Sequence, residues 1–152
     1  GVPRWLAALE GAGFMLCEHP AWDALRVEAG TPLFGIDFDA ENLPQEVARN
    51  ERAISFTKGC YLGQETVARI DALGHVNQEL TGVRFDGTEV PSAGMELMQE
   101  ESVAGRVTSA TFSPRLNAPL ALAMIRRRSL PPGTRLDSPA GVGDEAKLPI
   151  DP

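Results

Sequence analysis

Apolar residues recur at helical spacing in three short segments of the first half of the chain. Residues 3–10 predict one helix, and residues 20–29 predict a second that ends at Gly30. A third helix of about ten residues is expected to begin near Glu65, because an acidic side chain in the first turn favours a helix start. Polar positions between these segments contain many turn formers, so the helices are expected to be short and separated.

Two stretches of the first half lack helical spacing. Residues 14–17 form a short apolar run, which predicts a strand and places Cys17 in the core. Residues 31–53 are broken by proline, glycine and aspartate, which predicts an ordered loop with short turns. The acidic residues of this region are expected to form a solvated loop, because their spacing fits no calcium-binding motif. They are Asp37, Asp39, Glu41 and Glu46.

After residue 76 the pattern changes to short apolar runs separated by turn residues, which is typical of a small antiparallel barrel or sandwich. The expected strands are centred on residues 80–85, 96–98, 103–107 and 120–125. Turns are expected at 86–87, 91–92, 113–114, 131–133 and 138–139. The sequence therefore predicts an α+β chain, with a boundary near residue 76 between residues 1–75 and a barrel at 76–152.

Composition narrows the class of protein. The chain has 152 residues, 43% of them hydrophobic, which is enough for a buried core. The net charge is -7, so a broad nucleic-acid-binding surface is disfavoured. No apolar run is long enough to span a bilayer, and two distant cysteines with two histidines match neither a disulfide framework nor a zinc site. We expect a cytoplasmic protein without a structural metal.

Arg26 and Glu28 form the first candidate site, at the end of the second predicted helix. An arginine suits a carboxylate, and a glutamate suits the amide and amine edge of a heteroaromatic ring. Residues two apart do not share a helix face, so both reach one cleft only if the last turn unwinds at Gly30. The simpler interpretation from the residues alone is an exposed, solvated helix end.

Cys60 is the second candidate, within the octet Lys58–Glu65. A position just before a helix N-terminus, with Lys58 nearby, favours the thiolate and predicts a reactive thiol. Gly59 and Gly63 leave room around the sulfur. The alternative from the residues alone is a small buried side chain in a tight turn.

Arg126, Arg127 and Arg128 form a basic run that follows an apolar strand. In an acidic chain this run is interpreted as a strand end that discourages aggregation. Contact with an anion or an RNA phosphate is the alternative.

Several motifs, in this order, resemble the YgfZ group of folate-binding proteins, which are relatives of the glycine-cleavage T-protein (aminomethyltransferase). They are Arg26–Gly30, Leu43–Glu46, Ile54–Glu65 and Ala68–Arg69. The later segments Gly105–Ser109 and Ser113–Ala123 look like the T-protein C-terminal barrel signature, and Lys147–Ile150 looks like its closing strand. The octet is the specific part, since its Cys60, Tyr61, Gly63, Gln64 and Glu65 stand at the group's motif positions.

The resemblance implies a function as well as a fold. Residues 1–75 would be the C-terminal part of a folate-binding domain, and 76–152 the appended barrel. Arg26 and Glu28 would lie at a cleft for tetrahydrofolate or a one-carbon derivative, and Cys60 would be the hallmark thiol, with Lys58 beside it. The implied role is support of iron–sulfur proteins, including enzymes that modify tRNA, with iron–sulfur client or assembly proteins as partners.

Two alternatives stay open. In the first, the protein is a folate-dependent aminomethyltransferase in which Cys60 is incidental; the catalytic aspartate of such enzymes would lie outside this sequence. In the second, the barrel is a docking module without catalytic activity. One departure is that Asn77 and Gln78 stand where family members commonly carry a basic pair.

Overall fold

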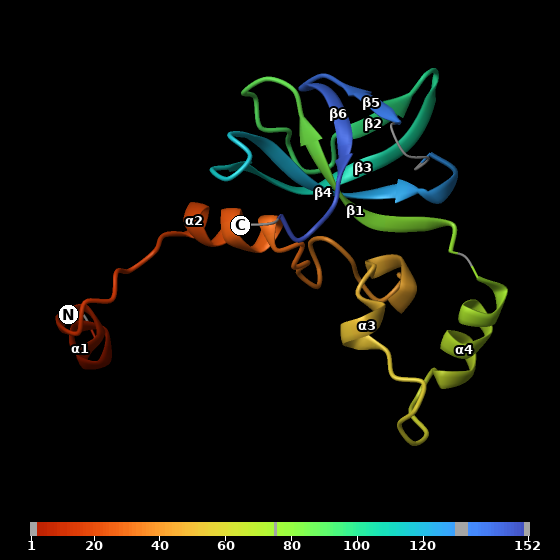
Figure 1. The fold of residues 1–152 in the computed structure, drawn as a ribbon, viewed down its shortest axis with the longest axis horizontal. Coiled ribbons are helices and arrows are strands. Elements are labelled where there is room, and N and C mark those ends of the chain that lie inside the picture. Colours follow the sequence, from red (N-terminus) through yellow and green to blue (C-terminus); the bar gives the residue numbers. More distant parts are fainter. Residues whose placement is uncertain (1–2, 75, 130–133, 151–152) are drawn as a thin grey trace.

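The computed structural model describes residues 3–74, 76–129 and 134–150, in which a row of short helices precedes a β-barrel (Figure 1). The helical elements are α1 (Arg4–Gly11), α2 (His19–Glu28), the 3₁₀ turn η1 (Pro44–Val47), α3 (Asn50–Ala53), α4 (Gln64–Leu73) and the 3₁₀ turn η2 (Arg127–Ser129). The strands are β1 (Gln78–Phe85), β2 (Glu96–Gln99), β3 (Ser102–Ser113), β4 (Ala118–Arg126), β5 (Arg135–Ser138) and β6 (Gly141–Ala146).

The strands of the described chain close into an antiparallel barrel in the order β1-β4-β3-β2-β5-β6. Strand β1 pairs with β4 on one side and with β6 on the other, which leaves no open sheet edge between first and last strand. The α+β class and the antiparallel barrel predicted from the sequence are confirmed. Strands β5 and β6 were not predicted individually, and the turn expected at 131–133 lies outside the described residues.

Strand β4 is formed by the longest apolar run of the sequence. The run is apolar at every position because both faces of the strand are covered. Its side chains alternate between the barrel interior and the layer under α2, and every residue from Ala118 to Ile125 is buried. The interior cluster contains Val83, Phe85, Leu97, Ala104, Val107, Ala121, Ala123, Ile125 and Leu136. The outer cluster contains Val27, Leu80, Leu120, Leu122 and Met124. Helix α2 therefore packs on the outside of the barrel wall.

A β-bulge interrupts β3 where it faces α2. Val107 pairs with Ala123 and Ser109 with Leu122, so Thr108 is the extra residue on β3. A bulge re-aims side chains that would otherwise point to opposite faces. Thr108 and Ser109 consequently both turn polar groups toward the segment that carries Arg26 and Asp37.

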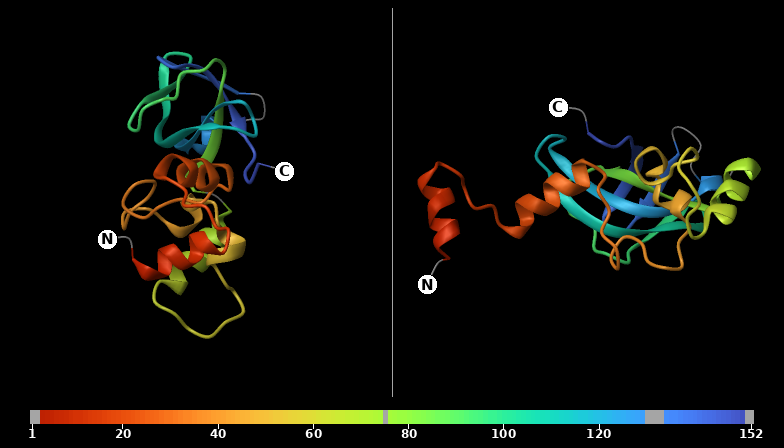
Figure 2. Two further views of the ribbon diagram at one scale, coloured as in Figure 1. Left: turned by 90° about the vertical axis from the view of Figure 1, so that its left-hand side faces the viewer. Right: turned by 90° about the horizontal axis from the view of Figure 1, so that it is seen from below.

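The first predicted helices are confirmed, but the N-terminal segment does not join the core. Helix α1 and the residues after it extend away from the barrel (Figures 1 and 2). The strand predicted at residues 14–17 is wrong, because this run carries no sheet pairing and is exposed, with Cys17 at the surface. An apolar run becomes a buried strand only where a partner strand covers it, and no described strand lies beside this one.

The C-terminal tail also differs from the prediction. The closing strand is β6, whereas Lys147–Ile150 leaves the sheet and runs against α2, where the Ile150 amide donates to the Glu28 carbonyl oxygen (2.8 Å). The Leu148 side chain fills the space between Gly30 and Gly82, where added Cβ atoms would come within 2.9 and 2.8 Å of it. Two glycines thus let the tail hold α2 against the barrel.

Candidate functional site

Arg26 is the centre of a buried polar cluster between α2 and β3. Its side chain is 6% exposed, and its Nε donates to Asp23 (2.7 Å). Nη1 donates to Asp37 (3.1 Å) and Nη2 to Ser109 (2.9 Å). Asp37 is fully buried and also accepts from the Leu33 amide (2.8 Å). Thr108, on the bulge, completes the cluster by donating to Asp37 (2.6 Å). These bonds tie the helix and the following loop to the barrel.

Glu28 forms a second polar cluster one half-turn further along α2. One carboxylate oxygen accepts from the Ser113 hydroxyl (2.6 Å) and from the Arg115 amide (3.3 Å). The other lies 3.3 Å from Arg115 Nε. The Glu28 side chain is 6% exposed, while that of Arg115 is 46% exposed. Glu28 is therefore oriented by the end of β3 and the turn after it.

These positions correct the interpretation drawn from the residues alone. A solvated helix end is wrong for both Arg26 and Glu28, because both are buried and paired. The solvated acidic loop is wrong in part: Asp39 and Glu41 are exposed, but Asp37 and Glu46 are buried. Helix α2 also stays wound through Glu28, so the two side chains reach the barrel without the unwinding at Gly30 that was given as the condition for a shared cleft.

A cavity of about 370 Å³ opens beside these clusters. Its walls come from α2, the residues after it, the turn after β3 and the C-terminal tail. The lining residues are Trp22, Leu25, Arg26, Glu28, Ala29, Thr31, Arg115, Pro149 and Ile150. Trp22 and Leu25 are more than half exposed. The cavity thus combines an apolar rim with a carboxylate and a guanidinium.

Two sequence motifs contain the barrel partners of Arg26 and Glu28, although the role of these partners is not predicted from the sequence. Thr108 and Ser109 lie in the Gly105–Ser109 motif, and Ser113 and Arg115 begin the next one. The structure shows that both motifs supply polar partners to α2.

Cys60 lies in an exposed loop between α3 and α4, and its thiol is free and exposed. The alternative of a buried cysteine is therefore wrong. The expected position at a helix start is also wrong, because α4 begins at Gln64 after a left-handed Gly63. Lys58 places its ammonium group 4.4 Å from the centre of the Tyr61 ring. Glu65 stands in the first turn of α4, as predicted. A reactive thiol at Cys60 stays a prediction.

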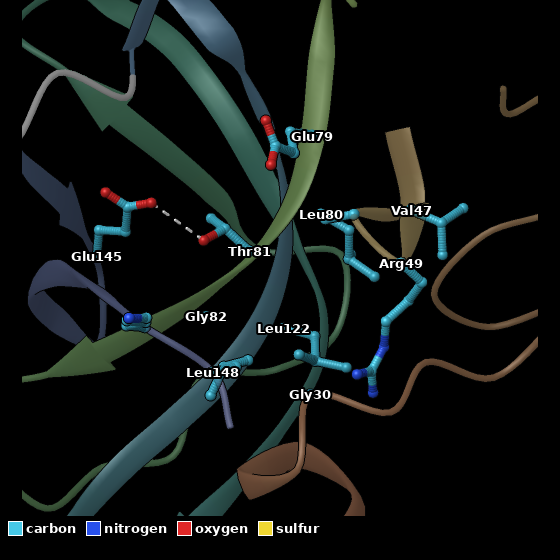
Figure 3. Close-up of a pocket in the computed structure, with 12 residues that line it drawn as sticks. Gly30, Val47, Arg49, Glu79, Leu80, Thr81, Gly82, Leu122, Glu145 and Leu148 are labelled. Carbon is cyan, nitrogen blue, oxygen red and sulfur yellow. Dashed lines mark hydrogen bonds between the residues drawn. The ribbon is translucent and has the colours of Figure 1, made fainter. Parts of the chain in front are cut away.

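A second hollow of about 500 Å³ lies on the outer wall of the barrel, between β1, β6, the tail and the segment after η1 (Figure 3). Arg49 reaches across it and donates to the Ala29 carbonyl and the Thr31 hydroxyl, both at 3.1 Å. Burial and then the nearby Arg52 lower the pKa of Arg49. Glu145 on the opposite side accepts from Thr81 (3.3 Å). Arg49 thus fixes the segment after α2.

Arg126 ends β4, as predicted for the basic run, and Arg127 and Arg128 begin η2. Arg126, Arg127 and Arg128 are exposed and line a hollow of about 750 Å³ with Asn77 and Gln78.

Among residues 3–74, 76–129 and 134–150, no group of three or more His, Cys, Asp and Glu side chains is arranged to hold a metal ion. In the same ranges no helix is both long and apolar enough to cross a membrane. His75 lies outside the described residues.

The sequence matches the family described as "Glycine cleavage T-protein C-terminal barrel domain" over residues 78–148. Two similar relatives are proteins named aminomethyltransferase. That of Nostoc sp. is 34% identical over 125 residues, which cover 82% of this chain and 33% of the relative. That of Streptomyces avermitilis is 34% identical over 145 residues, covering 91% of this chain and 37% of the relative. The chain therefore spans about a third of the length of these curated relatives.

The fold is also that of a solved structure, the glycine cleavage system aminomethyltransferase T of Bartonella henselae. The TM-score is 0.85 at 23% identity, over 97% of this chain and 43% of that chain. Helices and barrel together therefore adopt an arrangement found in a larger protein. Residues 78–148 therefore match the glycine cleavage T-protein C-terminal barrel family, and most of the chain is similar to a part of proteins named aminomethyltransferase.

Proposed function

We propose that this chain takes part in tetrahydrofolate-dependent aminomethyl transfer. The supporting observation is that aminomethyltransferase relatives match α2 as well as the barrel. The Streptomyces avermitilis match covers 91% of the chain, so even if all unmatched residues lay at the N-terminus, α2 would be included. The proposal therefore includes the cavity of about 370 Å³ beside Glu28, and not the barrel alone.

The donors and acceptors of the cavity fit a pteridine ring. A carboxylate has about four lone-pair positions. In Glu28, the Ser113 hydroxyl and the Arg115 amide occupy two of them on one oxygen. The other oxygen, which forms an ion pair with Arg115, can still accept an N–H from the ring edge. The exposed indole of Trp22 offers a flat apolar surface at the same cavity. When bound, tetrahydrofolate would accept the one-carbon unit.

The residues around the cavity have separate roles in this proposal. Glu28 binds the ligand, while Ser113 and Arg115 orient its carboxylate. Arg26 is a positioning residue, because each of its three nitrogens already donates to a protein oxygen. Its contribution is to hold α2 at a fixed distance from β3.

Replacing Glu28 with glutamine tests the proposal. Tetrahydrofolate is titrated into the protein that carries this chain, and binding is followed by tryptophan fluorescence. We expect the dissociation constant to rise about tenfold or more, because a charge-assisted hydrogen bond is lost. Glu10→Gln, the same change at an exposed site on α1, is the matched control and should leave affinity unchanged. Equal affinity in wild type and Glu28→Gln would refute binding through this carboxylate.

Support of iron–sulfur proteins is the second candidate function, and the exposure of Cys60 favours it. An exposed thiol is accessible for redox chemistry or transient ligation. Because a cluster takes four ligands, Cys60 would need others from a partner protein.

Cys60→Ser separates the two functions. If the protein acts in aminomethyl transfer, the variant keeps its tetrahydrofolate affinity and transfer activity. If it supports iron–sulfur proteins, the variant no longer restores iron–sulfur enzyme activity in cells that lack the protein. Cys17→Ser, which changes another exposed free thiol, is the matched control. Loss of complementation in Cys60→Ser alone would select the second function.

A further inference from the structure

The basic hollow (Arg126, Arg127 and Arg128, with Val76, Asn77 and Gln78) is the strongest concentration of positive charge in the sequence. The chain has only 14 Lys and Arg residues and a net charge of -7, yet three of its cations are consecutive here. Such a run needs an explanation beyond solubility, because acidic side chains would serve solubility equally well in this chain.

The hollow is formed where two strands meet. Gln78 at the start of β1 pairs with Arg126 at the end of β4, so the residues before β1 lie beside the basic run. The Arg127 amide donates to the Asn77 carbonyl oxygen (3.0 Å), which fixes the backbone of η2 against them. The guanidinium groups therefore extend from a backbone that is held in place.

The three arginines differ in how they are engaged. Arg126 donates one Nη1 hydrogen to the Val103 carbonyl oxygen (3.0 Å), and Arg127 lies 3.6 Å from Glu79. Arg128 makes no hydrogen bond or ion pair with any described residue. Each guanidinium has five N–H donors, so most of the donors in the hollow are available to a ligand.

We propose that the basic hollow is a docking site for an acidic segment of a partner protein, whose carboxylates pair with Arg126 and Arg128. Guanidinium groups match carboxylates in a two-bond geometry, and the volume of about 750 Å³ admits several side chains. Charge complementarity at such a surface mainly accelerates association and selects the partner.

Nucleic acid is a poorer fit for this site. Binding to a phosphate backbone draws its affinity from many contacts, on the order of 6–10. Among the described residues three arginines line this hollow, and the rest of the chain has a net charge that repels a long polyanion. A short acidic segment needs only the contacts that the hollow offers.

The test is a titration of the 152-residue chain with a fluorescein-labelled hexaglutamate peptide, followed by anisotropy at low salt. We expect saturable binding that weakens as salt is raised. Arg126→Gln/Arg128→Gln should raise the dissociation constant about tenfold or more. Arg84→Gln/Arg106→Gln removes the same charge from exposed positions elsewhere on the barrel and is the matched control.

Several results would overturn the proposal. The first is that the peptide shows no saturable binding, and the second is that both double variants weaken peptide binding equally. The third is that a hexauridine RNA binds more tightly than the peptide, and the fourth is that self-association of the chain competes with the peptide. Because Arg126 also holds the Val103 carbonyl, the melting temperature of each variant is measured. The single variant Arg128→Gln, which breaks no contact within the described chain, should by itself weaken peptide binding.

Discussion

Replacing Asp37 with alanine is expected to lower the free energy of unfolding by about 3 kcal/mol. Its carboxylate is fully buried and accepts from Arg26, Thr108 and the Leu33 amide. Alanine would leave the buried Arg26 guanidinium with one remaining carboxylate, that of the partly exposed Asp23. Removing one partner of a buried ion pair is strongly destabilising. Because Asp23 still pairs with Arg26 in the variant, we expect a loss at the lower end of the usual range.

Chemical denaturation in urea measures this effect. Asp39→Ala is the matched control, since Asp39 is exposed and lies two residues away, and it should change stability by less than about 0.5 kcal/mol. Asp37→Asn keeps the size of the side chain but not its charge. Its loss in the free energy of unfolding should fall between those of Asp37→Ala and Asp39→Ala. A loss in Asp37→Ala no larger than that in Asp39→Ala would show that the buried pair does not hold α2 in place.

Gly105→Ala is expected to destabilise the barrel by about 2 kcal/mol. An added Cβ would overlap the Met124 carbonyl oxygen and come within 2.8 Å of Ile125 Cα. Both are backbone atoms of the neighbouring strand, so no side chain can rotate to relieve the contact. Glycine at this position therefore allows the close approach of β3 and β4.

Thermal unfolding followed by circular dichroism tests this, with an expected fall in melting temperature of about 5 °C. Gly59→Ala is the matched control, because no atom of the part of the chain that the structure describes lies within 4 Å of the added Cβ. Its melting temperature should stay close to that of the wild type. Similar losses in both variants would mean that the strand spacing around Gly105 adjusts freely.

The barrel could be predicted from the sequence because alternation and turn residues are local signals. Strand β4 was recognised from its apolar run, and it is buried on both faces. Strands β5 and β6 were missed because both are short and carry charged or glycine residues in place of an apolar run. The resemblance predicts the closing strand at Lys147–Ile150, whereas the closing strand β6 ends at Ala146.

The burial of Asp37 could not be predicted, because its partners are distant in the sequence. Arg26 lies 11 residues before it and Thr108 lies 71 residues after it. The bulge at Thr108 brings this contact about, and the local pattern of β3 gives no sign of it. Cys17 is the opposite case: its local pattern predicts burial, but no described element covers it.

The bonds between α2 and β3 also bear on the order of folding. Ser109 lies 83 residues from Arg26, and Ser113 lies 85 residues from Glu28. Contacts between such distant residues form only after the intervening chain has been closed into a loop, whereas β3 and β4 are joined by a short turn. We therefore expect the β3–β4 hairpin to form first and α2 to dock late, so that its amides exchange with deuterium before those of the barrel.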